Sequence, residues 1–179
     1  QEGRTEYGDT ALYNEYLAAG VPPGQVVFVK DQKATKSNCE VELKELLKLA
    51  TPSSTLVFYY GGHGSPTGLN THEQEWQQKD IVSLIDSLFC GDRVVMLVDC
   101  CASGNFCRWI QPPHWVRYSF VCIITTAPYT EAGTACTMAA CWNNALQCSA
   151  DTLQLCRVMD FMYDSTAGIK GDIFTGYLG

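Results

Sequence analysis

Several features that would each define a class of protein are absent from this chain of 179 residues. No apolar run reaches the roughly 18 to 20 residues that a membrane-spanning helix requires. The ten cysteines include no Cys-x-x-Cys pair, and their spacing matches no zinc-binding template. Neither an Asn-x-Ser/Thr glycosylation acceptor nor an internal repeat is present. We therefore expect neither a membrane span nor a zinc-finger scaffold.

Basic residues are also scarce. The chain has 12 Lys and Arg residues and 19 Asp and Glu residues, which gives a formal net charge of −7. An acidic chain is a poor partner for nucleic acid and for anionic membranes, whereas a basic peptide suits it as a substrate. The cysteines fit either reduced buried thiols, as expected for Cys122 in an apolar strand, or some disulfides. The chain begins at Gln1 and not at Met, so prior removal of a targeting segment also stays open.

What the chain does contain is a regular alternation of short apolar runs with amphipathic segments. With 46% hydrophobic and 17% charged residues, it has enough core for one globular domain over residues 1–179. Strands are predicted at residues 26–29, 56–60, 94–98 and 120–126. Helices are predicted at residues 12–17 with a C-cap at Gly20, at 37–50, 80–88 and 105–110, and over most of 132–164. This alternation predicts an α/β fold with a mostly parallel sheet covered on both faces.

The starts of two predicted helices carry capping signals. Ser37-x-x-Glu40 reads as a capping box, and Asp80 reads as the N-cap of the following helix. Between them, residues 65–79 are polar and are predicted to form a loop over the strand ends.

Two reactive side chains follow interior strands. His63 comes after Leu56–Tyr60 and two glycines, and Cys101 comes after Val94–Val98 and Asp99. The carboxyl ends of parallel strands open onto the ligand crevice of an α/β sheet. We therefore expect a thiolate nucleophile and its base at this edge.

The same residues carry a resemblance to a known family. Tyr60-Gly61-Gly62-His63-Gly64 resembles the Ser-Gly-His-Gly motif of the caspase and metacaspase superfamily. Asp99-Cys100-Cys101-Ala102-Ser103-Gly104 resembles the metacaspase Asp-Ser-Cys-His-Ser-Gly, and its frame is also similar to the legumain Glu-Ala-Cys-Glu-Ser-Gly. Looser matches lie at Gly8–Ala11 and at Asp172–Thr175, so the likeness spans nearly the whole chain. Ala102 departs from the metacaspase histidine.

The resemblance implies a three-layer α/β/α sandwich, the caspase-hemoglobinase fold, with a large-subunit-like part at residues 1–118 and a small-subunit-like part at 119–179. It implies a cysteine endopeptidase in which His63 is the base, Cys101 the nucleophile, and the backbone N–H groups of Gly64 and Cys101 the oxyanion donors. Cys100 is expected to face away from the crevice, since successive strand residues point to opposite faces. Glycine suits position 64 because a side chain would block the substrate's approach to the backbone.

The expected substrate pocket is acidic. By resemblance to metacaspases, Asp99 lines the S1 pocket and binds an Arg or Lys side chain at P1. Asp9 is expected to be the second acid, with a plain N-cap as its alternative role, and Thr126 is expected to lie on the opposite wall. Legumains also carry an acid before the cysteine yet select Asn, so an Asn-specific endopeptidase stays an alternative.

Other implications concern partners and regulation. The chemistry needs no cofactor, although calcium activates many metacaspases through acidic clusters that the sequence does not locate. No hydrophobic strand precedes Asp9 and the chain stops at Gly179, so the expected fold is incomplete at both ends and another polypeptide is a candidate to complete the sheet. A catalytically silent binding or scaffold module is the competing function. The expected compartment is cytoplasmic, or secreted or vacuolar for a legumain-like enzyme.

Overall fold

The computed structural model describes residues 5–109 and 117–125. The helices are α1 Thr5–Ala18, α2 Lys36–Lys48 and α3 Gln78–Leu88, with short 3-10 turns at Pro23–Gln25, Asp31–Lys33 and Ser103–Arg108. The strands are β1 Thr55–Gly61, β2 Gly68–Asn70, β3 Glu75–Gln77, β4 Arg93–Asp99 and β5 Phe120–Thr125. Within these residues, no helix is both long enough and apolar enough to cross a membrane.

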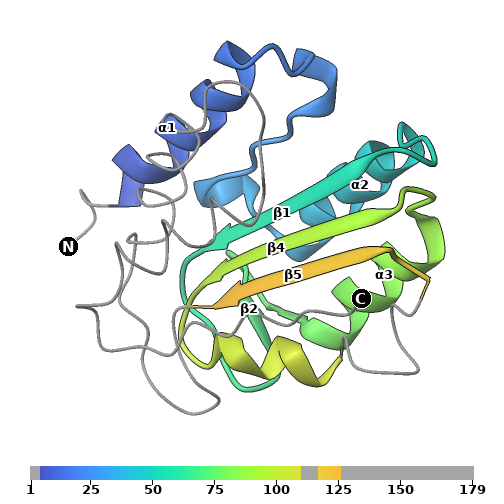
Figure 1. Ribbon diagram of the computed structural model, residues 1–179. Coiled ribbons are helices and arrows are strands. Elements are labelled where there is room, and N and C mark those ends of the chain that lie inside the picture. Colours follow the sequence, from blue (N-terminus) through green and yellow to red (C-terminus); the bar gives the residue numbers. More distant parts are fainter. Residues whose placement is uncertain (1–4, 110–116, 126–179) are drawn as a thin grey trace, which may run out of the picture.

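The central sheet is parallel and has the order β1-β4-β5 (Figure 1). Leu56 pairs with Val94, and Val94 pairs in turn with Val121. The apolar runs predicted as strands at 56–60 and 94–98 are therefore confirmed, and so is the third run as far as Thr125, the last described residue. With α2 leading into β1 and α3 leading into β4, the chain has an α/β fold.

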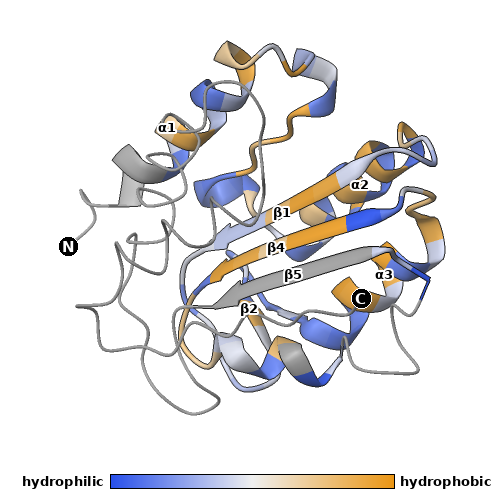
Figure 2. Ribbon diagram, viewed as in Figure 1, coloured by the Kyte–Doolittle hydropathy of each residue, from blue (hydrophilic) through white to orange (hydrophobic). Residues whose placement is uncertain are grey.

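One face of the sheet forms the core. Val94, Met96 and Val98 alternate along β4 and belong to a single buried cluster with residues of α2 and α3, among them Leu47 and Ile81. Figure 2 shows the hydrophobic residues running along β1 and β4. From the opposite face of β1, the Tyr59 hydroxyl donates to Asp9 Oδ1 of α1 at 2.6 Å. The sheet thus contacts α2 and α3 on one face and α1 on the other.

The end of α1 follows its sequence signal. Gly20 has a φ of +88°, where a side chain would be strained, and its N–H donates to the Leu17 carbonyl at 3.0 Å. The Val21 N–H donates to the Tyr16 carbonyl at 3.1 Å. This pair of bonds is the Schellman motif, so the predicted C-cap at Gly20 is confirmed.

The loop predicted at residues 65–79 is wrong in part, because β2 and β3 form an antiparallel hairpin there. Leu69 pairs with Trp76, and both side chains are buried in the core cluster. Two apolar residues spaced seven apart among polar ones were too weak a signal to predict short strands. The hairpin also pairs with the turn that carries His63, through an antiparallel bridge between Gly64 and Leu69.

Two other local predictions are corrected. No strand forms at residues 26–29, although the backbone of Val26 is extended (φ −122°, ψ 114°), because the stretch joins no ladder of the described residues. The capping box at Ser37 does not form, since Thr35 has the extended backbone of an N-cap and its hydroxyl accepts the Asn38 N–H at 3.2 Å.

The N-cap expected at Asp80 is also wrong. Gln77 is the N-cap of α3 and Asp80 lies in the first turn, because β3 runs directly into the helix. An acidic residue in the first turn still interacts favourably with the helix dipole.

Candidate functional site

The two predicted turns lie side by side at the carboxyl end of the sheet. Gly61 at the end of β1 pairs with Asp99 at the end of β4. One residue further along, the Gly62 N–H donates to the Asp99 carbonyl oxygen at 3.1 Å. His63 and Cys101 each follow this paired position by two residues, so the backbone brings the two turns together.

Gly64 lies against the cysteine turn. A Cβ added at Gly64 would lie 2.5 Å from Cys100 Sγ and 2.6 Å from the Cys101 carbonyl oxygen. Only glycine fits at such distances without moving the cysteine turn. We expected glycine here to leave room for substrate, and the structure supplies a different reason, which is contact within the chain itself.

The two neighbouring cysteines have different surroundings. Cys100 is 3% exposed and belongs to the core cluster, whereas Cys101 is half-buried. Burial, with the nearby Asp99 and Cys101 as smaller causes, raises the pKa of Cys100 to about 12. Cys100 is therefore a protonated thiol at neutral pH, as expected of a residue that faces the core. His63 is exposed at the end of its turn.

The cysteine turn is tight and polar. Ala102 has left-handed backbone (φ 54°, ψ 21°), which is uncommon for a residue other than glycine. Asn105 stabilises it, because its backbone N–H and its Nδ2 both donate to the Ala102 carbonyl, at 3.1 Å and 3.0 Å. Left-handed non-glycine residues cluster at functional sites. Asn105 was not among the predicted site residues, and only its place four residues after Cys101 hinted at this role.

Two carboxylates come to the same end of the sheet. Asp99 is 1% exposed, and Asp9 reaches β1 from α1. A Cβ added at Gly61, the strand partner of Asp99, would lie 3.4 Å from Asp9 Oδ1, so Asp9 lies against this position. Burial raises the pKa of Asp9, and the hydrogen bond from Tyr59 offsets part of that rise.

Tyr59 is thus a supporting residue that the sequence did not single out. The third predicted pocket residue, Thr126, lies outside the described residues.

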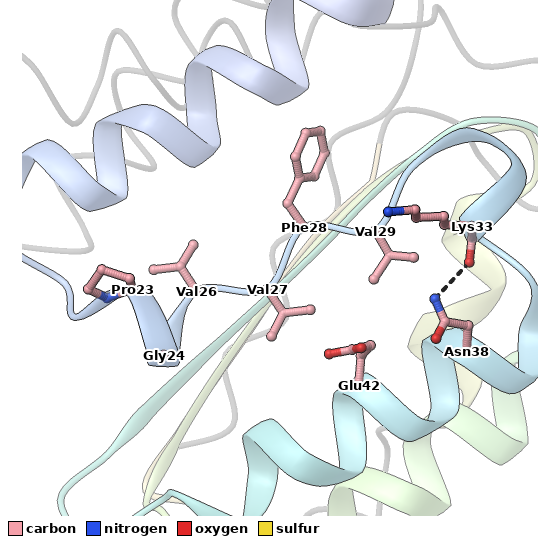
Figure 3. Close-up of a pocket in the computed structure, with 9 residues that line it drawn as sticks. All are labelled: Pro23, Gly24, Val26, Val27, Phe28, Val29, Lys33, Asn38 and Glu42. Atoms are coloured by element: carbon pink, nitrogen blue, oxygen red, sulfur yellow. Dashed lines mark hydrogen bonds between the residues drawn. The ribbon is translucent and has the colours of Figure 1, made fainter.

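A separate cavity of about 440 Å³ lies away from these turns (Figure 3). It is bounded by Pro23, Gly24, residues 26–29, Lys33 and the Asn38 and Glu42 side chains of α2. None of the predicted site residues lines it. In the part of the chain that the structure describes, there is no group of three or more His, Cys, Asp or Glu side chains that could hold a metal ion.

Comparison with known proteins adds no family assignment. No protein-family model matches this chain, and no curated protein matches it.

Proposed function

We propose that this chain is a cysteine endopeptidase of the caspase and metacaspase superfamily, built on a three-layer α/β/α sandwich. The observation that carries the proposal is the hydrogen bond from the Gly62 N–H to the Asp99 carbonyl, which joins the histidine turn to the cysteine turn. A strand-end histidine and a strand-end cysteine brought to one edge match what a thiol nucleophile and its base require.

In the proposed mechanism, His63 accepts the proton of the Cys101 thiol and the thiolate attacks the carbonyl carbon of the scissile peptide. The carbonyl oxygen becomes an oxyanion that accepts hydrogen bonds from the N–H groups of Gly64 and Cys101. Each such donor is worth about 2.7 to 4 kcal/mol in the transition state. The imidazolium of His63 then protonates the leaving amine, and water hydrolyses the resulting thioester.

Cys101 is preferred to Cys100 as the nucleophile on grounds of burial. A buried thiol with its pKa near 12 holds its proton at neutral pH, and Cys100 packs in the core cluster, on the face of the sheet opposite to Asp99. Cys101 is half-buried and follows directly.

The proposed preference is for Arg or Lys at P1. Asp9 and Asp99 lie at neighbouring positions of the same sheet end, one from α1 and one from β4. One buried and one half-buried acid, in a chain with a net charge of −7, favour a cationic side chain. A guanidinium could donate to both carboxylates, whereas an ammonium offers a point charge.

The test is covalent labelling followed by substrate profiling. A peptidyl acyloxymethyl ketone with Arg at P1 should modify one cysteine stoichiometrically in the wild type and in Cys100→Ala. The reagent should not modify Cys101→Ala or His63→Ala beyond the rate of a free thiol. Circular dichroism on each variant checks that the fold is retained.

The outcomes separate the alternatives. Labelling of Cys101 by an Arg reagent together with cleavage after Arg and Lys in a peptide library supports the proposal. Cleavage after Asn would favour a legumain-like enzyme. No selective labelling by any peptidyl reagent would overturn the enzyme assignment and favour a binding or scaffold module.

A further inference from the structure

The backbone carbonyl of His63 is held by two donors from two different strands. The Tyr60 hydroxyl of β1 donates to it at 2.6 Å, and the Asn70 N–H of β2 donates to it at 2.9 Å. The Tyr60 hydroxyl also lies 2.9 Å from the Asn70 carbonyl oxygen. Tyr60 therefore joins the histidine turn to the β2–β3 hairpin.

The histidine turn needs such a restraint. Gly61, Gly62 and Gly64 surround His63, and glycine has more backbone freedom to lose on ordering than any other residue. The His63 side chain is exposed, so core packing does little to orient it. A catalytic base must be held within about 0.5 Å of its productive position. The orientation of His63 therefore depends on what fixes its backbone.

Tyr60 is suited to this task. Its backbone pairs with Val98 within the sheet, and its side chain packs against the core cluster. Both contacts restrict the position of the ring. Burial raises the pKa of Tyr60 well above its ordinary value, so its hydroxyl remains a donor at any pH the enzyme would meet. Glycine at position 62 leaves room for the Tyr60 hydroxyl beside the turn, since a Cβ there would lie 2.8 Å from the hydroxyl oxygen.

We propose that Tyr60 is a positioning residue for His63, acting through the hydrogen bond from its hydroxyl to the His63 carbonyl. The catalytic consequence rests on the proposed function, in which His63 is the base. Tyr60 touches no substrate in this proposal, so its effect falls on the chemical step and not on binding.

The experiment compares Tyr60→Phe with Tyr118→Phe as a matched control. Tyr118 is a buried tyrosine whose hydroxyl donates to the Ile85 carbonyl at 3.3 Å, remote from the two turns. For an Arg-P1 peptide, Tyr60→Phe should lower kcat about three- to tenfold, the value of one hydrogen bond, and change KM less than twofold. Tyr118→Phe should leave both constants within twofold of the wild type.

A second readout does not depend on activity. With ¹⁵N-labelled histidine, the ring signals of the three histidines are resolved by NMR, and His63→Ala assigns the signal of interest. Tyr60→Phe should shift and broaden the His63 signal and leave the other two unchanged. Gly62→Ala, which displaces the Tyr60 hydroxyl while keeping it, should do the same. Gly24→Ala is its control, since nothing lies within 4 Å of a Cβ added there.

Three outcomes are decisive. A changed His63 signal with reduced kcat in both test variants supports the proposal. An unchanged His63 signal in folded Tyr60→Phe and Gly62→Ala overturns it. A wild type that cleaves no peptide, with a His63 signal that still responds to Tyr60→Phe, upholds the positioning role and removes the proposed peptidase function.

Discussion

Cys100 and Cys101 illustrate how much one step along the chain changes the chemistry of a side chain. With its pKa near 12, Cys100 is ionised to the order of one part in 10⁵ at pH 7. It contributes packing against Gly64 and the core. Cys101 lies where the strand has ended and the chain turns through Ala102, so it is the thiol that a peptide could reach.

Asp99 gives the sharpest residue-level prediction about substrate. Asp99→Asn keeps the shape of the side chain and removes its charge, and a hydrogen bond to a charged group contributes about 1.5 to 3 kcal/mol. The specificity constant for an Arg-P1 peptide should therefore fall by about one to two orders of magnitude. Cleavage of neutral-P1 peptides should change far less, and a Lys-P1 peptide should lose less than the Arg-P1 peptide. Steady-state kinetics on the three peptides measures this.

An equal loss on all three peptides would give Asp99 a structural role at the cysteine turn and not a role in binding P1. This alternative has a physical basis, because the Asp99 carbonyl already accepts the Gly62 N–H and the residue is 1% exposed. Thermal unfolding of the variant distinguishes the two, since only the structural role requires a lower Tm.

At the level of helices and strands, the sequence predicted the elements whose apolar residues form a clear pattern. The strands β1 and β4 were predicted from short continuous apolar runs, and the helices α1 and α3 from apolar residues at helical spacing. The two turns of the site followed from those strands, since small residues directly after a buried run mark its carboxyl end. The short β2–β3 hairpin was missed because only Leu69 and Trp76 carry its burial.

Hydrogen bonds between distant residues could not be predicted. The hydroxyl of Tyr59 bonds to Asp9, which lies 50 positions away in the sequence, and the hydroxyl of Tyr60 bonds to Asn70, which lies 10 positions away. No local pattern encodes these partners, because a tyrosine in a strand is equally well explained by packing. The cap at Thr35 was missed for another reason, since Ser37 offered a competing hydroxyl two residues away.

Trp76 tests how the hairpin is held. Its side chain is 4% exposed and packs edge-on to Phe58, with 6.3 Å between ring centroids. Within the described residues, its Nε1 has no hydrogen-bond partner, and a buried unsatisfied donor costs about 1 to 3 kcal/mol. Trp76→Ala should lower the free energy of unfolding by about 3 to 5 kcal/mol. Trp76→Phe should change it by less than about 1.5 kcal/mol, since relief of the unpaired N–H offsets the lost volume.

Urea unfolding followed by circular dichroism measures both Trp76 variants, with a constant m-value as the check on two-state behaviour. Equal destabilisation by Phe and Ala would contradict the argument and would mean that the indole N–H has a partner that stabilises it.

At the level of the whole molecule, the excess of acidic residues favours binding of the proposed basic substrate and lowers the stability of the fold. The net charge of −7 attracts a basic peptide, and the carboxylates of Asp9 and Asp99 gather at one end of the sheet. A carboxylate whose pKa is raised by burial costs stability when it is ionised. Under the proposed function, this pair of acids lowers the free energy of unfolding and raises the affinity for a basic side chain.

Asp9→Asn should therefore stabilise the fold while weakening cleavage after basic residues. The pKa of Asp9 is raised in the fold from its ordinary value of 3.8, so ionisation disfavours the folded state above that range and not below it. The gain in free energy of unfolding should be largest near pH 7 and should shrink as pH falls toward 4, because the wild-type carboxylate then becomes protonated. Glu73→Gln, at an exposed position, removes the same formal charge and is the control for net charge. Urea unfolding at several pH values, with KM for an Arg-P1 peptide, tests both halves. A gain independent of pH, or one that Glu73→Gln reproduces, would show that buried charge at Asp9 is not its cause.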